Sequence, residues 1–310
     1  MSEIILHNYP QSPVAEKVRI GFGMKGLSWR SVEIPRLPPK PDVVALTGGY
    51  RRTPVMQIGA DIFCDSICIL REIERRHPSP TFFPGGADGM AYGVSRWTDD
   101  GLFTLCVKII LGAAGDALDP DFAQDRGRLY LGPAWADGLK AANADLPHLA
   151  AQLRAHFGWA NDRLATGRQF MLGTEPGLPD ALIWHVVWFI RGRWADGPAF
   201  LSQYPALSAW EDRMGAIGHG TSEELSPEEA IQIAKDTPIA TEAAEDPLDP
   251  QGLTVGMAVA VSPDVDGGEQ SVEGTVQAAT RDTVAVLRTD DRAGDVCVHF
   301  PRAGYRVSIL

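Results

Sequence analysis

A serine able to stabilise an anion lies at the start of a predicted helix near the N-terminus. Ser12 precedes Pro13, and proline is favoured at the first helical position, so Ser12 is predicted to be the N-cap residue. Backbone N–H groups and the positive end of the helix dipole stabilise an anion at such a position. Taken alone, this pattern favours a plain helix cap. The Ser12 hydroxyl is also suited to donating a hydrogen bond to the thiolate of another molecule.

The energies of these interactions are sufficient for thiolate stabilisation. Lowering the pKa of a thiol by about 2 requires about 2.7 kcal/mol. A hydrogen bond to a charged group contributes about 1.5–3 kcal/mol, and a helix terminus adds about 0.3–1 kcal/mol. A nucleophilic-serine hydrolase is not expected, because the sequence lacks the G-x-S-x-G motif.

Thr53 and Pro54 begin a predicted strand, a position where proline is tolerated. If the bond between them is cis, the backbone N–H and C=O of Thr53 would turn toward a ligand and pair with a peptide as a strand does. The preceding residues Arg51 and Arg52 have two interpretations, as partners of a ligand carboxylate or as solvated charges of a loop.

Asp65 and Ser66 begin the next predicted helix, where either residue is suited to capping. In a functional role, the Ser66 hydroxyl and the N–H groups of the helix start would bind a carboxylate, while Asp65 would bind an ammonium group. Together these groups match the head group of an α-amino acid.

Composition and charge are those of a soluble globular protein, with 45% hydrophobic and 22% charged residues. The formal charge is −12, and residues 221–250 carry nine acids against one base. Residues 1–84 instead carry eleven Lys/Arg against eight Asp/Glu. A nucleic-acid partner is therefore not expected, whereas the N-terminal third is suited to an anionic small molecule.

The cysteines Cys64, Cys68, Cys106 and Cys297 are scattered and are predicted to be small buried hydrophobic residues. No second cysteine pair or histidine cluster accompanies them, so no metal is expected. No segment resembles a signal peptide, and the longest apolar stretch, residues 181–190, is too short to span a membrane. We therefore expect a cytoplasmic location and no membrane partner.

Hydrophobic periodicity predicts three regions. Residues 1–84 alternate strands and helices in the order β-α-β-α-β-β-α, which indicates a compact α/β domain. Residues 87–236 have helical periodicity, with clear helices at Ala91–Leu111, Leu146–Thr166 and Pro179–Arg191. After an acidic linker, residues 252–310 alternate with period two, which predicts a small all-β, barrel-like module.

The order of the Ser-Pro, X-Pro and Asp-Ser motifs resembles the thioredoxin-like domain of the glutathione transferase superfamily. The segments "YPALSAWEDRM" and "GLPDAL" are similar to parts of its helical domain; Asp180 is retained in the second, but Gly177 stands where serine or threonine is usual. The resemblance extends over about residues 1–235. Residues 252–310 lie outside the usual plan of the superfamily, and we expect them to be a packing or dimer-stabilising extension.

The resemblance implies glutathione as co-substrate and assigns roles at the matching positions. Ser12 occupies the place of the catalytic serine or cysteine. Thr53, before Pro54, would pair with the cysteinyl backbone of glutathione, and Arg52 falls where glutamine or lysine often stands. Asp65 and Ser66 would bind the γ-glutamyl end. The resemblance thus implies five glutathione-binding residues: Arg52, Thr53, Pro54, Asp65 and Ser66.

Two further roles follow from the resemblance. Tyr9 is the alternative to Ser12 as the hydrogen-bond donor to the thiolate, since some members place a tyrosine hydroxyl on the same loop. Trp97, Asp100 and Phe103 are candidates for the pocket of a small hydrophobic electrophile, although packing and solvation explain them equally well.

The resemblance favours a homodimeric enzyme that stabilises the glutathione thiolate for conjugation, isomerisation or dehalogenation. The alternative is a non-catalytic binding or scaffold protein of the same fold. A thiol oxidoreductase is disfavoured because no cysteine lies near the helix start at Ser12.

Overall fold

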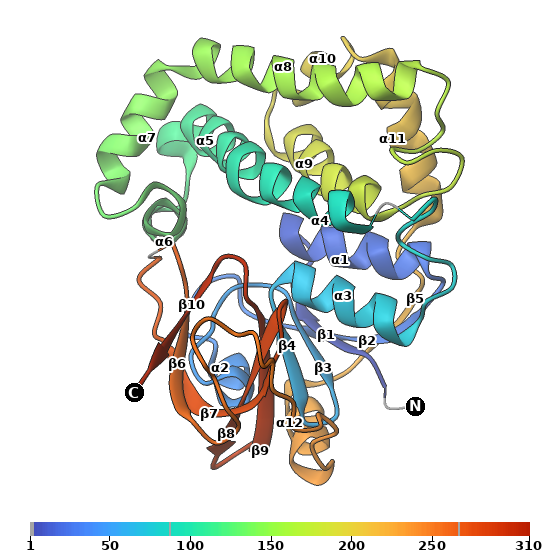
Figure 1. The fold of residues 1–310 in the computed structure, drawn as a ribbon. Helices are drawn as coiled ribbons and strands as arrows, with labels where there is room; N and C mark the ends of the chain where they lie inside the picture. Colours follow the sequence, from blue (N-terminus) through green and yellow to red (C-terminus); the bar gives the residue numbers. More distant parts are fainter. Residues whose placement is uncertain (1–2, 87, 266) are drawn as a thin grey trace. The chain divides into compact units, whose positions relative to one another are not determined.

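The computed structural model describes residues 3–86, 88–265 and 267–310 (Figure 1). The chain divides into two compact units. The sheet unit contains residues 3–18, 28–75 and the described part of 221–310, and the helical unit contains residues 19–27 and the described part of 76–220. The two ends of the sequence therefore fold into the same unit. Ala87, where the predicted helical domain begins, lies outside the described residues.

The N-terminal part of the sheet unit has the predicted β-α-β-α-β-β-α order. Its elements are β1 (Ile5–Asn8), α1 (Pro13–Met24), β2 (Ser28–Glu33), α2 (Pro41–Thr47), β3 (Val55–Ile58), β4 (Asp61–Cys64) and α3 (Ser66–Arg76). β1 pairs parallel with β2 and antiparallel with β3, which pairs antiparallel with β4. Gly59 has a φ of 62° at the turn between β3 and β4, a left-handed conformation that glycine adopts without steric cost.

The predicted C-terminal strands are confirmed. They are β6 (Ala258–Pro263), β7 (Val272–Ala279), β8 (Thr283–Asp290), β9 (Gly294–Pro301) and β10 (Tyr305–Ile309). β9 pairs parallel with β4, with Asp61 opposite Cys297 and Ile62 opposite Val298. The C-terminal strands thereby extend the N-terminal sheet, whose order is β10-β6-β7-β8-β9-β4-β3-β1-β2-β5 (Figure 1).

Within the stretch where helical periodicity was predicted, the structure contains a short strand, β5 (Thr221–Glu224), which pairs parallel with β2 at the edge of the sheet. Its four residues are exposed. A strand without a buried face lacks the alternating hydrophobic pattern that would reveal it in a sequence.

One hydrophobic core serves the N-terminal and C-terminal strands together. α2 and α12 (Pro227–Asp236) pack on each other and on β9. The core includes residues from the N-terminal strands, α2, α12 and the C-terminal strands: Val55, Ile62, Val43, Leu46, Ala230, Ile231, Val286, Val298 and Phe300. Because both sets of strands bury their apolar faces in this core, they stabilise each other.

The helical unit contains α4 (Asp88–Arg96), α5 (Phe103–Ala114), α6 (Pro120–Leu131), α7 (Trp135–Ala144), α8 (Leu146–Ala165), α9 (Leu178–Arg193), α10 (Gly197–Leu201) and α11 (Pro205–Ile217). The three clear helices of the sequence pattern correspond to α4–α5, α8 and α9. A π-helical turn over Trp97–Leu102 separates α4 from α5, and a 3₁₀ turn over Gly115–Ala117 follows α5.

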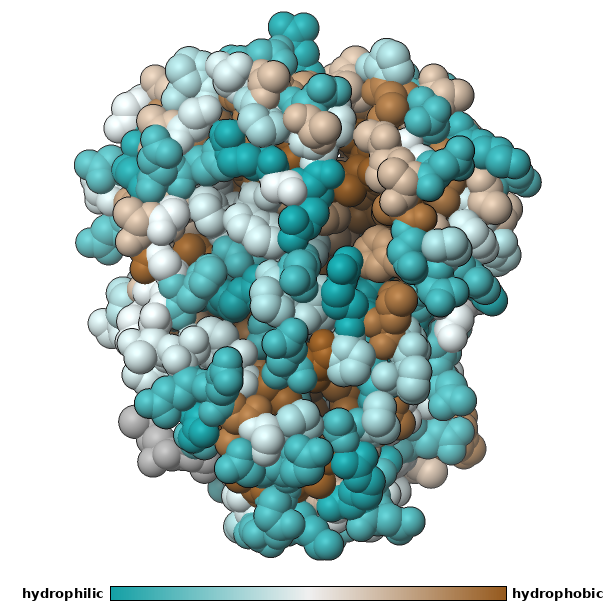
Figure 2. Space-filling model, turned by 180° about the vertical axis from the view of Figure 1, so that it is seen from behind, coloured by the Kyte–Doolittle hydropathy of each residue, from teal (hydrophilic) through white to brown (hydrophobic). Residues whose placement is uncertain are grey.

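No helix among the described residues is long and apolar enough to cross a bilayer. On the face drawn in Figure 2, hydrophilic side chains cover most of the surface, and hydrophobic ones appear in several patches between them.

Candidate functional site

Ser12 is the N-cap residue of α1. Its Oγ accepts a hydrogen bond from the N–H of Ala15 at 3.1 Å, and its carbonyl oxygen accepts one from the N–H of Glu16 at 3.0 Å. The residue is buried, with 2% of its surface exposed. A hydroxyl that accepts a backbone hydrogen bond still carries its own O–H hydrogen. Capping and thiolate stabilisation are therefore compatible roles for the same side chain.

Tyr9 lies on the same loop, and its carbonyl oxygen accepts the N–H of Ser12 at 3.1 Å. Its side chain belongs to the hydrophobic core of the sheet unit. The ammonium nitrogen of Lys40 lies 5.7 Å from the centre of the Tyr9 ring. Packing in the core thus accounts for the position of Tyr9.

Lys40, directly before α2, connects the Tyr9 loop to the strand start at Thr53. Its Nζ donates to the carbonyl oxygen of Arg51 at 3.1 Å and to Oγ1 of Thr53 at 3.0 Å. The Thr53–Pro54 peptide bond is cis. Sequence reasoning missed Lys40, because a lysine in a proline-rich loop carries no signal of burial.

Lys17 connects α1 to the start of α3. Its Nζ donates to Oγ of Ser66 at 3.0 Å, and both residues are buried. The sequence contains a signal for the burial of Lys17, because Lys17 comes three residues after Val14 and this spacing places it on the apolar face of a helix.

Of the two residues predicted as caps, Asp65 takes the capping position and Ser66 is the first residue of α3. Oδ1 of Asp65 accepts the N–H of Ile67 at 2.8 Å, and α3 begins at Ser66. Asp65 has a φ of 78°, a left-handed conformation that aspartate tolerates better than most residues.

Two predicted ligand-binding residues contact the C-terminal region. The guanidinium of Arg52 donates from Nε to Oε1 of Glu269 at 2.8 Å and from Nη2 to Oε2 at 2.5 Å. The hydroxyl of Tyr305, on β10, lies 3.2 Å from Oδ2 of Asp65 and 3.2 Å from the hydroxyl of Tyr50. Burial raises the pKa of both tyrosines well above the usual value, so both hydroxyls stay protonated.

The candidate electrophile residues occupy different environments in the helical unit. The indole N–H of Trp97 donates to Nδ1 of His156 at 2.8 Å. Phe103 is buried with 6% of its surface exposed, whereas the Asp100 side chain is 61% exposed and forms an ion pair with Arg96. Trp97 and Asp100 lie on the π-helical turn, and Phe103 begins α5.

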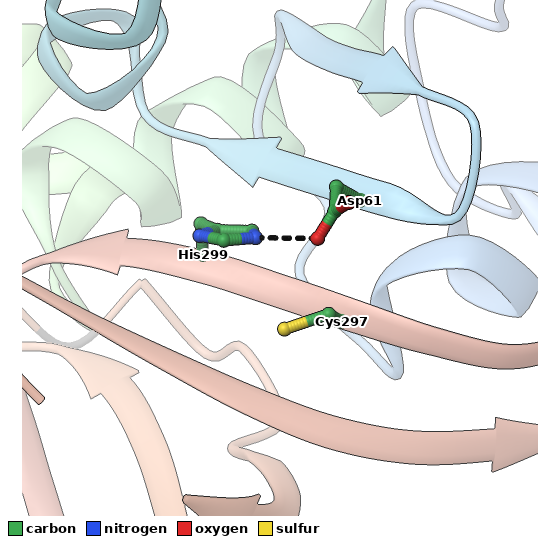
Figure 3. Close-up of side chains that lie close together, drawn as sticks. All are labelled: Asp61, Cys297 and His299. Carbon is green, nitrogen blue, oxygen red and sulfur yellow. Dashed lines mark hydrogen bonds and ion pairs between the residues drawn. The ribbon is translucent and has the colours of Figure 1, made fainter. Parts of the chain in front are cut away.

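A second polar cluster joins β4 to β9 (Figure 3). Asp61, Cys297 and His299 each offer one metal-ligating atom, all within 4.8 Å of one another. The Thr241 hydroxyl lies 2.5 Å from Oδ1 of Asp61 and 3.0 Å from Nε2 of His299, and the N–H of Ala240 donates to Oδ2 of Asp61 at 2.9 Å.

This cluster is accounted for as an anchor for the chain that follows α12. Burial by itself would raise the pKa of Asp61, but hydrogen bonds from His299 and Thr241 outweigh it and keep that pKa below the usual value. Burial raises the pKa of the Cys297 thiol to about 12, which favours the protonated form over the thiolate that binds metals.

All four cysteines are buried, as predicted. Burial raises the pKa of Cys64 and Cys68 well above the usual value and also raises that of Cys106. A thiol in such surroundings is a poor nucleophile. The geometry therefore does not favour a cysteine-based redox mechanism.

Comparison with known proteins defines the family. The chain matches the glutathione S-transferase N-terminal domain over residues 6–81 and the glutathione S-transferase C-terminal domain over residues 133–213. A GST-like protein from Pseudomonas syringae is 36% identical, with 100% of each chain covered and a TM-score of 0.79. The chain belongs to the glutathione S-transferase family. The full coverage of this relative also includes the C-terminal strands.

More distant structures share the fold. A beta-etherase from Sphingobium sp. is 15% identical over 70% of this chain and 96% of its own, with a TM-score of 0.53. A theta-class glutathione S-transferase from Xanthomonas axonopodis pv. citri, solved with glutathione bound, is 16% identical over 69% of this chain and 92% of its own, with a TM-score of 0.50. No match was found among curated protein sequences.

Proposed function

We propose that this member of the family is a glutathione-dependent transferase in which Ser12 stabilises the glutathione thiolate. The observation that carries the proposal is the arrangement around α1. Ser12 caps the helix, and Lys17 of the same helix is hydrogen-bonded to Ser66. Lys40, whose Nζ lies 5.7 Å from the centre of the Tyr9 ring, is hydrogen-bonded to Thr53.

The chemistry follows from the hydroxyl at a helix N-terminus. A hydrogen bond from Ser12 stabilises the thiolate more than the thiol, so it lowers the pKa of the bound thiol. The sulfur then forms a bond to an electrophilic carbon, and a leaving group departs with its bonding electron pair. Addition followed by elimination of the same thiolate would give isomerisation instead.

We also propose a binding region for the electrophile, an oligomeric state and a cellular location. We assign the electrophile to the region of Trp97, Asp100 and Phe103, and Trp97 is the best candidate because Phe103 is buried in packing and Asp100 is paired with Arg96. We also propose a cytoplasmic location and a homodimeric state. Light scattering of the purified protein would test whether it is a dimer.

Ultraviolet titration of the thiol of bound glutathione tests the role of Ser12. We expect the bound thiol to have a pKa about 2 below that of free glutathione, and Ser12→Ala to restore most of the difference. Tyr9→Phe is the matched control, since it also removes one hydroxyl from the same loop, and it should leave the thiol pKa unchanged.

Two results would contradict the proposal. An unshifted pKa in the wild-type complex would rule out thiolate stabilisation. Restoration of the free value by Tyr9→Phe alone would assign the role to Tyr9.

A non-catalytic binding protein is the second candidate, and one observation favours it. Arg52 and Asp65, two of the residues proposed to bind glutathione, already contact Glu269 and Tyr305 of the same chain. Turnover of a chlorodinitrobenzene with glutathione distinguishes the two: a Ser12-dependent rate supports the enzyme, and no rate above the uncatalysed reaction supports the binding protein.

A further inference from the structure

Tyr305 of β10 contacts the carboxylate that the proposed site offers to a ligand ammonium group. Its hydroxyl lies 3.2 Å from Oδ2 of Asp65 and 3.2 Å from the hydroxyl of Tyr50. Burial raises the pKa of both tyrosines well above the usual value, so both hydroxyls keep a hydrogen to donate. Because Tyr305 has a single hydroxyl hydrogen and a carboxylate is a stronger acceptor than a phenol, this hydrogen goes to Asp65. The hydrogen of the Tyr50 hydroxyl then serves the contact between the two phenols.

Packing fixes the direction in which the Tyr305 hydroxyl points. Tyr305 is 9% exposed, and its ring centre lies 5.6 Å from that of Phe300 and 6.4 Å from that of Tyr50. Its backbone pairs with β6, where it lies opposite Pro263. A ring packed against two other rings cannot turn its hydroxyl away without a loss of packing. Tyr305 is therefore a rigid donor to Asp65.

The contact with Tyr305 does not remove the ability of Asp65 to bind an ammonium group. Oδ1 of Asp65 accepts the N–H of Ile67 at 2.8 Å, and its Oδ2 faces the Tyr305 hydroxyl. A carboxylate offers about four lone-pair sites, and these two contacts use one on each oxygen. Asp65 is half-buried, and the neutral phenol leaves its negative charge in place. The contact is therefore compatible with binding of a ligand ammonium group to the same carboxylate.

We infer that Tyr305 is a positioning residue of the glutathione site: its hydroxyl fixes the Asp65 carboxylate in the orientation that binds the ammonium group of the γ-glutamyl end. The inference rests on the proposed function. A carboxylate already held in its binding orientation loses less conformational entropy when the ligand binds. The α-carboxylate of the ligand remains assigned to Ser66 and the start of α3. The C-terminal strands thus contribute to glutathione recognition through a residue 240 positions away from Asp65 in the sequence.

Binding of two peptides to the full-length chain tests the inference. The probes are glutathione and glutaryl-cysteinyl-glycine, which differs from glutathione only in lacking the α-amino group. We expect the wild-type protein to bind glutathione more tightly by calorimetry, because only glutathione offers an ammonium group to Asp65. Tyr305→Phe removes one hydroxyl and keeps the ring in the core. It should weaken glutathione binding about 5-fold and leave the Kd of the other peptide unchanged.

Two further variants separate this effect from a general loss of stability. Tyr204→Phe is the matched control, because the Tyr204 hydroxyl, in the helical unit, donates to the carbonyl oxygen of Arg154 at 3.0 Å. It should leave the ratio of the two Kd values unchanged. Asp65→Asn should remove most of the preference for glutathione, and adding Tyr305→Phe to it should change the preference no further. Thermal unfolding verifies that each variant is folded.

The outcomes also separate this inference from the proposed function. If Tyr305→Phe leaves the ratio of the two Kd values unchanged, or weakens both peptides equally, Tyr305 has only a structural role, and the role of Ser12 is unaffected. Tighter glutathione binding by Tyr305→Phe overturns the inference as well, because the hydroxyl would then compete with the ligand for Asp65. Equal affinity of the wild-type protein for the two peptides has the same consequence. If neither peptide binds wild type or variants, both the inference and the proposed function are wrong.

Discussion

Lysine is among the residues least often found inside proteins, yet Lys17 and Lys40 are only 1% and 4% exposed. A buried ammonium group requires hydrogen-bond acceptors, and these lysines find them on Ser66, Arg51 and Thr53. Each lysine therefore connects two segments that local sequence patterns describe separately.

His7 allows a test of the sheet unit at the scale of one residue. It lies on β1, its Nε2 is 2.9 Å from Oε1 of Gln57, and burial lowers its pKa from 6.5 to about 4. Between these two values the unfolded chain binds more protons than the folded one. The free energy of unfolding should therefore be highest above about pH 6.5 and fall by about 3 kcal/mol as the pH falls to about 4.

Urea unfolding at pH 7, 6, 5 and 4.5 measures this dependence. His7→Leu has no group to titrate at this position, so its stability should fall less steeply over the same range. Identical pH dependence in the two proteins would show that His7 is not responsible.

At the scale of one element, α9 depends on a buried carboxylate near its start. Asp180 accepts hydrogen bonds from the N–H of Met171 at 2.9 Å, the N–H of Gly177 at 2.8 Å and the indole N–H of Trp210 at 2.8 Å. A capping box pairs the side chain and backbone of the N-cap residue with those of the third helical residue. Gly177 at the N-cap has no side chain, so the hydrogen bond from its N–H to the Asp180 carboxylate is the part of the box that a side chain provides.

Asp180→Ala leaves three buried N–H groups without this acceptor. We expect it to lower the free energy of unfolding by about 3 kcal/mol or more, measured by denaturant titration. Asp162→Ala, at an exposed position of α8, is the matched control and should change stability by less than about 0.5 kcal/mol. Equal stability of the two variants would refute the role assigned to Asp180.

At the scale of the whole molecule, the C-terminal strands are part of the N-terminal sheet. β9 pairs with β4, and Phe300 lies in the shared core, with its ring centre 5.9 Å from that of Tyr50. The N-terminal strands therefore rely on residues from the far end of the chain for part of their buried surface.

Phe300→Ala should lower the free energy of unfolding by about 3–5 kcal/mol. Because the core is shared, hydrogen exchange should accelerate in β3 and β4 as well as in β8 and β9. Leu248→Ala removes an apolar side chain that is 87% exposed and should leave exchange unchanged. Acceleration confined to β8 and β9 would show that the two sets of strands unfold independently.

Local features could be predicted from the sequence, and long-range ones could not. The caps at Ser12 and Asp65 depend on hydrogen bonds that reach two or three residues along the chain. Glu269 could not be linked to Arg52, because the two lie 217 positions apart and each is an ordinary charged residue in a loop. The pairing of β4 with β9 was hidden for a similar reason, since both strands have buried patterns that suit several neighbours.

The sequence by itself determined the order of the N-terminal elements and the helix start at Ser12, because periodicity and capping act over a few residues. The ordered motifs along residues 1–235 also indicated the family. Only the tertiary structure decided that the C-terminal strands extend the N-terminal sheet and that Glu269 meets Arg52. These contacts depend on which sheet edge and which charge are brought close when the whole chain folds, and no local pattern specifies them.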